Sequence, residues 1–177
     1  MANSADVEFK PLLVRTRAGH VLNVREYGVD DFGALVEMYK GFEPKRVAQG
    51  LPPPDVPRIA HWLDELQHKS RSLIALNGNQ VVGHAVLCPI SESAAEFTIF
   101  VHQDFRELRL GTILTRLALQ FAARMNFSEV YLTTELTNVA AVSLYRKIGF
   151  RLINSSGDEC EMRIDIADYI ASLPCAA

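Results

Sequence analysis

The sequence predicts a mixed α/β (α+β) fold in which helices pack against one central sheet. Short apolar stretches separated by turn-forming residues indicate strands, and the stretch from Leu110 to Phe121 repeats its apolar residues at helical spacing. The chain has 177 residues, of which 49% are hydrophobic and 22% charged, as expected of one globular domain. We therefore expect a single domain over residues 1–177, with its core at about 21–166 and flexible ends at 1–6 and 171–177.

The first half of the chain predicts a hairpin, two helices and a long loop. In chain order these are strands at 12–16 and 21–25 around Ala18-Gly19-His20, a helix at 32–42 capped by Asp30 or Asp31, and a helix at 58–68. Residues 43–57 contain five of the eight prolines. Because interior proline breaks both helices and strand ladders, this segment is predicted to be a loop.

The second half predicts strands that alternate with helices. Asn77-Gly78 is a strong hairpin signal between two apolar runs. The elements in chain order are strands at 72–76, 80–87 and 96–101, a helix from Leu110 to Phe121, a strand at 129–134, a helix at 138–147, and a closing hairpin of 150–153 with 159–166. His84 falls in the middle of a strand and is expected to be a core histidine.

Charge and cysteine usage exclude several classes of function. The formal net charge is −3, so no basic field attracts nucleic acid. No apolar run reaches the ~18 residues of a membrane span, and the first residues lack the order of a signal peptide. The three cysteines, Cys88, Cys160 and Cys175, show no metal-ligand spacing. We expect a cytoplasmic protein with reduced thiols, no metal, no nucleic-acid partner and no membrane contact.

The segment from Val101 to Thr112 joins a predicted strand to the longest helix and has features of an anion site. A helix N-terminus presents about four unpaired N–H groups and a partial positive charge. A tight loop leading into it suits a phosphate or pyrophosphate, and Arg106 and Arg109 add positive charge. The alternative is a solvated turn capped by Asp104.

The segment from Asn138 to Phe150 has the pattern of a helix end built around a ligand. An asparagine opens the helix, and Tyr145 lies two turns later on the same face. Gly149 then ends the helix before another apolar run.

Together these two segments resemble the GNAT superfamily of acetyl-CoA-dependent N-acetyltransferases. The later segment matches the family pattern at Asn138, Ala141, Leu144, Tyr145, Lys147, Gly149 and Phe150, and the earlier one matches as Arg106-Glu107-Leu108-Arg109-Leu110-Gly111. The resemblance implies a mostly antiparallel, twisted central sheet of about six to seven strands flanked by about four helices. It also implies that the sheet splays between its fourth and fifth core strands.

The resemblance implies acetyl-CoA as co-substrate and assigns residues to it. The implied cofactor-binding residues are Phe100, Val101, Arg106, Leu108, Arg109, Leu110, Gly111, Thr112, Asn138 and Tyr145. Backbone groups of Phe100 and Val101 would bond the pantetheine arm. Asn138 would bond the same arm, cap its helix, or do both.

Arg109 departs from the family pattern, which has glycine at its position. If Arg109 has a left-handed backbone, that conformation costs roughly 1–2 kcal/mol. Either the backbone there is already helical, or the guanidinium offsets the strain by pairing with a phosphate of the cofactor. Weakened or lost cofactor binding is the third alternative.

Tyr145 and Glu96 are the candidate catalytic residues. By resemblance Tyr145 would protonate the departing CoA thiolate, although a tyrosine tied into the core is an alternative. Glu96 begins the strand that would hold the thioester carbonyl, near where some family members place a glutamate base. Glu135 is a second candidate base, and a solvated carboxylate is the alternative for either glutamate.

The predicted function is therefore transfer of an acetyl group from acetyl-CoA to a primary amine in a ternary complex. The acceptor, a small-molecule amine or a protein lysine or N-terminus, is not specified by the sequence, although the loop at 43–57 is expected to shape its binding site. The alternatives are a catalytically silent acyl-CoA sensor and an interaction domain without cofactor. An exposed edge strand near the C-terminus makes a homodimer plausible.

Overall fold

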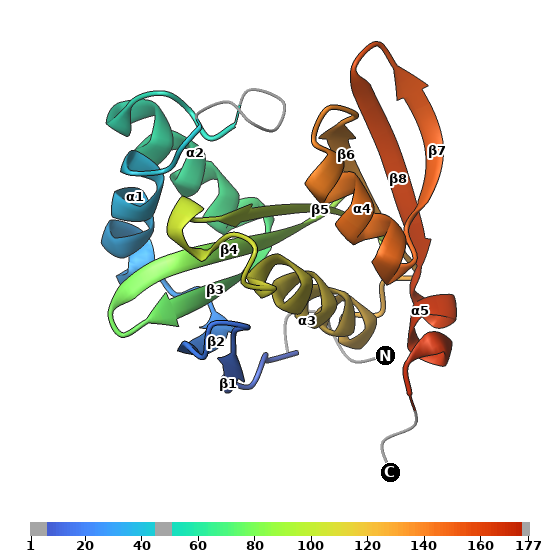
Figure 1. Cartoon of the computed structure of the whole chain (residues 1–177), viewed down its shortest axis with the longest axis horizontal. Helices are drawn as coiled ribbons and strands as arrows, with labels where there is room; N and C mark the ends of the chain where they lie inside the picture. The colour runs from blue at the N-terminus through green and yellow to red at the C-terminus, as the bar shows by residue number, and fades with distance from the viewer. Residues whose placement is uncertain (1–6, 45–50, 175–177) are drawn as a thin grey trace.

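The computed structural model describes residues 7–44 and 51–174, which form one eight-stranded mixed sheet with helices on both faces (Figure 1). The strands are β1 (Leu12–Arg15), β2 (Val21–Glu26), β3 (Arg71–Asn77), β4 (Gln80–Pro89), β5 (Ala94–Val101), β6 (Glu129–Glu135), β7 (Arg151–Ser156) and β8 (Glu159–Asp165). The α-helices are α1 (Phe32–Lys40), α2 (Val56–Lys69), α3 (Leu110–Arg124), α4 (Val139–Ile148) and α5 (Ile166–Ser172). Short 3-10 turns at Val29–Asp31 and Gln103–Phe105 precede α1 and α3. The mixed α/β class is confirmed.

The strands lie in the order β1-β2-β3-β4-β5-β6-β8-β7, and every neighbouring pair is antiparallel except β5 with β6. That parallel pair is joined over only three residue pairs, the last being Glu96 with Tyr131. Beyond it the two strands separate (Figure 1). Counted from β2, these are the fourth and fifth core strands, so the predicted splay is confirmed.

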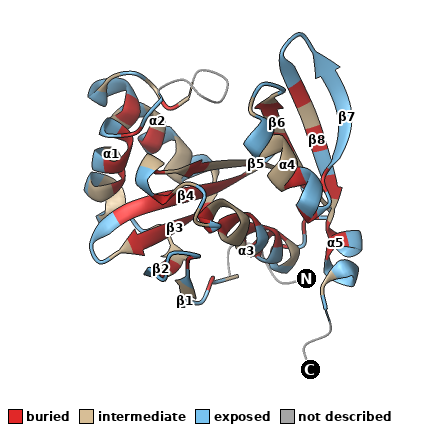
Figure 2. Cartoon of the chain, in the orientation of Figure 1, coloured by how far each residue is buried: buried red, intermediate tan, exposed pale blue. Residues whose placement is uncertain are grey.

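Each face of the sheet has its own hydrophobic core because side chains alternate between the faces along a strand. The larger core lies between the sheet and α3, α4 and α5, and it includes Leu114, Phe121 and Tyr169. The smaller core lies under α1 and α2 and includes Tyr39 and Phe100. Figure 2 shows the buried residues along the central strands and the inner side of α3, and the exposed residues along β7.

The structure adds elements to the sequence prediction. The described residues form eight strands rather than six or seven, and five α-helices rather than four. Ile166, expected to end the last strand, begins α5 instead, because the Asp165 side chain accepts from the N–H of Asp168 and caps the helix. Residues 171 and 172, expected in a flexible end, lie in α5.

The predicted loop at 43–57 also ends earlier than expected. Helix α2 begins at Val56, with the Asp55 side chain accepting from the N–H of Arg58. Pro57 fits the first turn because the N–H it lacks would have no partner there. Residues 45–50 of this loop, and the ends at 1–6 and 175–177, lie outside the described residues.

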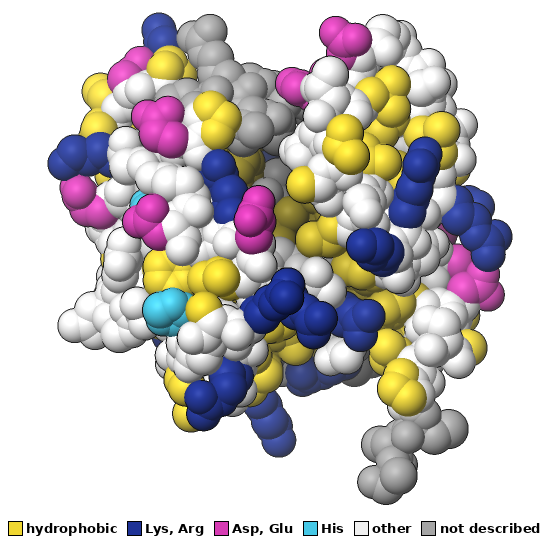
Figure 3. Space-filling view, in the orientation of Figure 1, with side chains coloured by type: hydrophobic (Ala, Val, Ile, Leu, Met, Phe, Trp, Pro, Cys, Tyr) yellow, Lys and Arg dark blue, Asp and Glu magenta, His cyan; other side chains and the backbone are white. Residues whose placement is uncertain are grey.

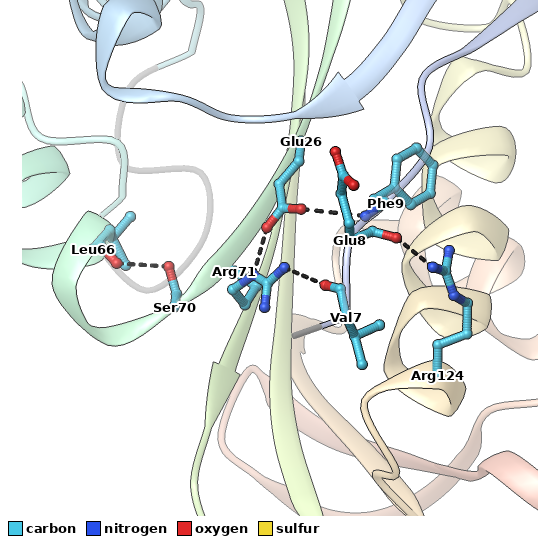
Figure 4. A network of polar contacts seen from close by, with 8 residues as sticks. All are labelled: Val7, Glu8, Phe9, Glu26, Leu66, Ser70, Arg71 and Arg124. Carbon is cyan, nitrogen blue, oxygen red and sulfur yellow. Dashed lines mark hydrogen bonds and ion pairs between the residues drawn. The ribbon is translucent and has the colours of Figure 1, made fainter. Parts of the chain in front are cut away.

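The N-terminal segment packs beside the sheet and α3 through the network in Figure 4. Arg71 donates to the carboxylate of Glu26 and, over 2.6 Å, to the carbonyl of Val7. Arg124 at the end of α3 donates to the carbonyl of Glu8. The Arg71 guanidinium carbon also lies 5.0 Å from the centre of the Phe121 ring. One arginine on β3 thus joins β2, α3 and the N-terminal segment.

Candidate functional site

A cavity of about 680 Å³ opens where β5 and β6 separate. It runs from the loop before α3 to the inner side of α4, and Figure 3 shows the corresponding hollow, lined by hydrophobic side chains. Its lining residues are Phe42, Phe97, Thr98, Ile99, Phe100, Val101, Arg106, Glu107, Arg109, Gly111, Thr112, Thr133, Thr134, Glu135, Thr137, Asn138, Ala140, Ala141, Leu144 and Tyr145. Eight of the ten predicted cofactor residues are in this list, so the fold brings the two sequence motifs together.

The cavity exists because β5 continues beyond the last residue pair that it forms with β6. From Phe97 to Val101, β5 is paired with β4 on one side and has no strand partner on the side facing β6. Unpaired backbone N–H and C=O groups on that side can receive an extended ligand by hydrogen bonding. Figure 3 also shows Lys and Arg side chains gathered at the lower end of the hollow, over the start of α3.

The start of α3 has a left-handed backbone on two residues that are not glycine. Arg109, which precedes the first helical residue, has φ 67° and ψ 5°, and Glu107 has φ 60°. The strained alternative for Arg109 is therefore the one observed. Gly111 and Thr112 in the first helical turn line the cavity, where free N–H groups favour an anion.

Arg106 lines the cavity but its guanidinium is bonded to the protein backbone. It donates over 3.1 Å to the carbonyl of Val101 and also donates to the carbonyl of Glu43. Its guanidinium carbon lies 5.0 Å from the centre of the Phe42 ring, and burial lowers the pKa of Arg106. The Arg106 side chain therefore links the end of β5 to the segment that follows α1.

Two predicted cofactor residues do not line the cavity. Leu110 is fully buried in the larger core and Leu108 packs against that core. Their side chains hold the loop and the helix in place. The Phe100 side chain belongs to the smaller core, so β5 joins that core to the cavity.

Helix α4 presents the second motif to the cavity. The Asn138 side chain accepts from the N–H of Ala141 over 3.2 Å, which confirms the cap, and Asn138 also lines the cavity. Gly149 ends the helix with φ 119°, a value that favours glycine. Both ends of the helix are therefore fixed by the residues of the motif.

Tyr145 is buried and lines the cavity. Its ring packs edge-on against those of Phe97 and Phe150, with centroids 6.5 and 5.6 Å away. Burial raises the pKa of Tyr145 above its ordinary value. Among the described residues no hydrogen-bond partner is found for its hydroxyl, which leaves that group available to a ligand.

The two candidate bases occupy different positions. Glu96 stands opposite Cys88 and Tyr131, at the last residue pair before β5 and β6 separate, and does not line the cavity. Glu135, at the end of β6, does line it and accepts from the Thr137 hydroxyl over 3.3 Å. Geometry thus favours Glu135 as the carboxylate nearer to a ligand in the cavity.

His84 is the core histidine that the sequence predicts. It is 1% exposed, and its Nδ1 lies 2.7 Å from the Tyr39 hydroxyl in the smaller core. Burial lowers the pKa of His84 to about 3, so the ring is neutral at pH 7. It stabilises the fold beneath α1 and does not line the cavity.

Several wall residues were not predicted from the sequence. Phe42 follows α1 and Phe97 lies on β5, and nothing in their local sequence distinguishes a cavity wall from a core. Thr133 and Thr134 follow an apolar run at the end of a strand, a signal that could have pointed to them.

Neither a metal-binding cluster nor a membrane-spanning helix is found in the part of the chain that the structure describes, residues 7–44 and 51–174. Within those ranges no cluster of three or more His, Cys, Asp or Glu side chains is arranged to hold a metal ion. In the same part of the chain no helix is both long and apolar enough to cross a membrane.

Comparison with curated proteins finds distant acetyltransferase relatives. N-acetyltransferase family 8 member 3 of Rattus norvegicus is 31% identical over 103 residues, which are 55% of this chain and 43% of the relative. Probable N-acetyltransferase san of Drosophila melanogaster is 26% identical over 113 residues, 60% of each protein. The chain spans about half the length of the curated relatives it matches.

Solved structures show the same fold at low sequence identity. The GNAT domain of S. lividans PAT has a TM-score of 0.76 at 16% identity, covering 88% of this chain and 96% of that one. Spermidine N-acetyltransferase from Vibrio cholerae, in complex with CoA and spermine, has a TM-score of 0.70 at 19% identity, covering 84% and 98%. The model of the acetyltransferase (GNAT) family matches residues 34–150, which include α3, α4 and the whole cavity. This chain belongs to the GNAT acetyltransferase family.

Proposed function

We propose that this protein is an N-acetyltransferase that moves an acetyl group from acetyl-CoA to a primary amine within a ternary complex. The observation that carries the proposal is the unpaired side of β5 from Phe97 to Val101, which opens into a cavity of about 680 Å³. The start of α3, which can bind an anion, and Tyr145 both line that cavity. A ligand with phosphates, an amide-bearing arm and a terminal thioester can contact all of these features.

Different residues of the cavity bind different parts of acetyl-CoA. Gly111 and Thr112 present the first-turn N–H groups of α3 to the phosphates, and the Arg109 side chain adds a positive charge. The unpaired backbone of β5 bonds the amide-bearing arm, as an added strand would. Its N–H groups near the thioester carbonyl stabilise the oxyanion that develops there.

Transfer to a protonated amine requires two protons to leave its nitrogen, one before it attacks and one as the amide forms, and it requires the CoA thiolate to depart. The second proton passes to solvent or to the thiolate once it has left. The amine nitrogen attacks the carbonyl carbon, the C–N bond forms, the C–S bond breaks, and the thiolate carries away the electron pair. An alkylamine with a pKa of about 10.4 is neutral in roughly one molecule in 2,500 at pH 7, so a base must accept its proton. Glu135 lines the cavity, whereas Glu96 lies at the last residue pair before β5 and β6 separate and does not line it; both are candidates.

Tyr145 is proposed to stabilise the departing thiolate. Burial raises the pKa of Tyr145, whereas a thiol has a pKa of about 8.5. Full proton transfer from this phenol to the sulfur is therefore unfavourable. Its hydroxyl instead donates a hydrogen bond to the sulfur while negative charge develops there.

A silent acyl-CoA sensor is the second candidate function. Glu96, one of the two candidate bases, does not line the cavity, which suits a protein that binds CoA without turnover. A sensor would bind CoA and lack a base positioned for turnover. A cytoplasmic location and a homodimer stay predictions from the sequence, although β7 does form an exposed edge strand.

Acetyl-CoA incubated with the full chain and a panel of amines tests these functions. The panel contains spermidine, a lysine-bearing peptide and peptides with free N-termini, and thiol release reports transfer. Turnover of any amine above the rate of spontaneous hydrolysis supports the enzyme. CoA binding by calorimetry without turnover of any panel member favours the sensor, and no binding contradicts both.

A further inference from the structure

The amide of Gln103 joins two segments that lie 60 residues apart in the chain. Its nitrogen donates to the carbonyl of Gly41 over 2.8 Å, and its oxygen accepts from the N–H of Glu43 over 3.1 Å. Gln103 belongs to the 3-10 turn between β5 and α3, whereas residues 41–43 directly follow α1. Both polar ends of one side chain therefore bond the residues on either side of Phe42.

Arg106 holds the same segment from the cavity side. It donates to the carbonyls of Val101 and Glu43, and its guanidinium lies over the Phe42 ring. Phe42 is only 2% exposed, packs against Phe100 with centroids 5.7 Å apart, and lines the cavity. The loop before α3 thus determines where this wall residue lies.

The two joined segments have different roles in the proposed reaction. The loop that holds Gln103 leads into Arg109, Gly111 and Thr112, where the phosphates of CoA are proposed to bind. The segment at 41–43 leads into the loop that was expected to shape the acceptor site. A connection between them links binding of the donor to the wall that the acceptor meets.

We propose that Gln103 is a positioning residue that transmits CoA binding at the start of α3 to residues 41–43 and thereby fixes Phe42. The inference rests on the proposed acetyl-CoA site. Gln103 does not itself line the cavity, so it acts through the backbone of Gly41 and Glu43. When CoA makes the loop before α3 more rigid, the two hydrogen bonds extend that rigidity to the second segment.

Hydrogen exchange of the full chain, measured by mass spectrometry with and without CoA, tests the coupling. In the unchanged protein CoA should slow exchange in a peptide covering the start of α3 and also in a peptide covering residues 38–44. In Gln103→Ala the slowing at the start of α3 should persist. In the peptide covering 38–44, the ratio of the exchange rates without and with CoA should fall about fivefold or more. This is the change expected for the loss of a hydrogen bond worth about 1 kcal/mol.

Gln120→Ala is the matched control, because Gln120 is an exposed glutamine on α3 outside the cavity lining. It should behave like the unchanged protein in both peptides. If Gln103→Ala is too unstable to measure, Gln103→Glu keeps the oxygen that accepts from Glu43 and loses the donor to Gly41, and it should show an intermediate loss.

Equal CoA-induced slowing at 38–44 in the unchanged protein and in Gln103→Ala would overturn the inference while leaving the proposed function intact. Slowing at α3 with none at 38–44 in the unchanged protein would also overturn it. If CoA slows exchange in neither peptide of the unchanged protein, both the inference and the proposed function fail.

Discussion

Tyr145 differs from an ordinary core tyrosine in its contact with the cavity. It is buried, its hydroxyl has no hydrogen-bond partner among the described residues, and it lines the cavity. The hydroxyl is not among the fully buried polar atoms, so it reaches the cavity, where a ligand can bond to it. The two flanking rings hold it in position.

Tyr145→Phe should lower kcat about 100-fold while changing CoA affinity less than about threefold, because the hydroxyl acts on the sulfur only as charge develops. Steady-state kinetics with the best panel amine, together with calorimetric titration of CoA, measure the two effects. Tyr169→Phe removes a tyrosine hydroxyl that donates to the carbonyl of Arg116 away from the cavity and should leave kcat unchanged. An unchanged kcat in Tyr145→Phe would remove this residue from the chemistry.

His84 should make the protein less stable as the pH falls. The unfolded chain binds a proton at the ordinary histidine pKa of 6.5, whereas the folded protein binds it only near pH 3. The stabilisation by neutral His84 is therefore complete above pH 6.5. It is lost as the pH falls from 6.5 towards 3, by about 1.4 kcal/mol per pH unit.

Urea unfolding between pH 7 and pH 4 measures this effect. His84→Gln should unfold with a smaller pH dependence, because its amide does not titrate. The exposed His61 provides the control, and His61→Gln should keep the pH dependence of the unchanged protein. Equal slopes for His84→Gln and His61→Gln would contradict the assignment.

The start of α3 combines a strained backbone with a positively charged side chain, both at Arg109. Arg109 adopts a left-handed backbone that glycine would adopt without strain. Its side chain is exposed and lines the cavity where phosphates are proposed to bind.

Arg109→Gly should stabilise the protein by up to about 1 kcal/mol and weaken CoA binding about tenfold. Chemical denaturation and calorimetry measure the two quantities. Asn126, which has φ 64° after the end of α3, offers a control: Asn126→Gly also changes a left-handed residue, but one away from the cavity, and should not change CoA affinity. Tighter CoA binding by Arg109→Gly would show that the arginine opposes the cofactor.

The elements themselves were largely predictable because their signals are local. Apolar spacing predicted α3, and Asn77-Gly78 predicted the hairpin of β3 and β4. Helix α5 was missed because Asp165 was included in the preceding strand, although Asp165 with the apolar pair Ile166 and Tyr169 is a recognisable helix start.

The position of the site's carboxylates was less predictable because it depends on the pairing of distant strands. Glu96 looked like a base in the sequence, yet its distance from the cavity depends on where β5 separates from β6, and that register joins residues far apart in the chain. The bond from Arg106 to the carbonyl of Glu43 likewise joins residues far apart in the chain.

At the scale of the whole molecule, the sheet is divided into two parts by the separation of β5 and β6. The strands β1 to β5 lie on one side and β6 to β8 on the other, joined by three residue pairs. Helix α3 packs against β4 and β5 on one side and against α4 and α5 on the other. The cavity lies between these two parts, and its shape therefore depends on the packing of the whole fold.

The network around Arg71 should stabilise this packing without affecting the site. Arg71→Met should lower the free energy of unfolding by about 1–3 kcal/mol, because it leaves the half-buried Glu26 carboxylate without this cation. Urea unfolding measures the loss, and CoA affinity should stay the same because neither residue lines the cavity. Lys69→Met, which removes a lysine from an exposed ion pair with Glu65, should have little effect on stability. Equal stability of the two variants would contradict the role given to the network.

Acetyl-CoA is proposed to bind between β5 and β6 with its phosphates at the start of α3, and calorimetric titration of acetyl-CoA into Thr112→Asp measures whether it does. Thr112 lines the cavity in the first turn of α3. An aspartate there suits the helix N-terminus but repels a phosphate, whereas Thr112→Asn is its neutral counterpart. We expect Thr112→Asp to fold with an undiminished melting temperature and to bind acetyl-CoA about 100-fold more weakly than the unchanged protein, while Thr112→Asn should bind within about fivefold of it. Equally tight binding by Thr112→Asp would rule out phosphate binding at the start of α3.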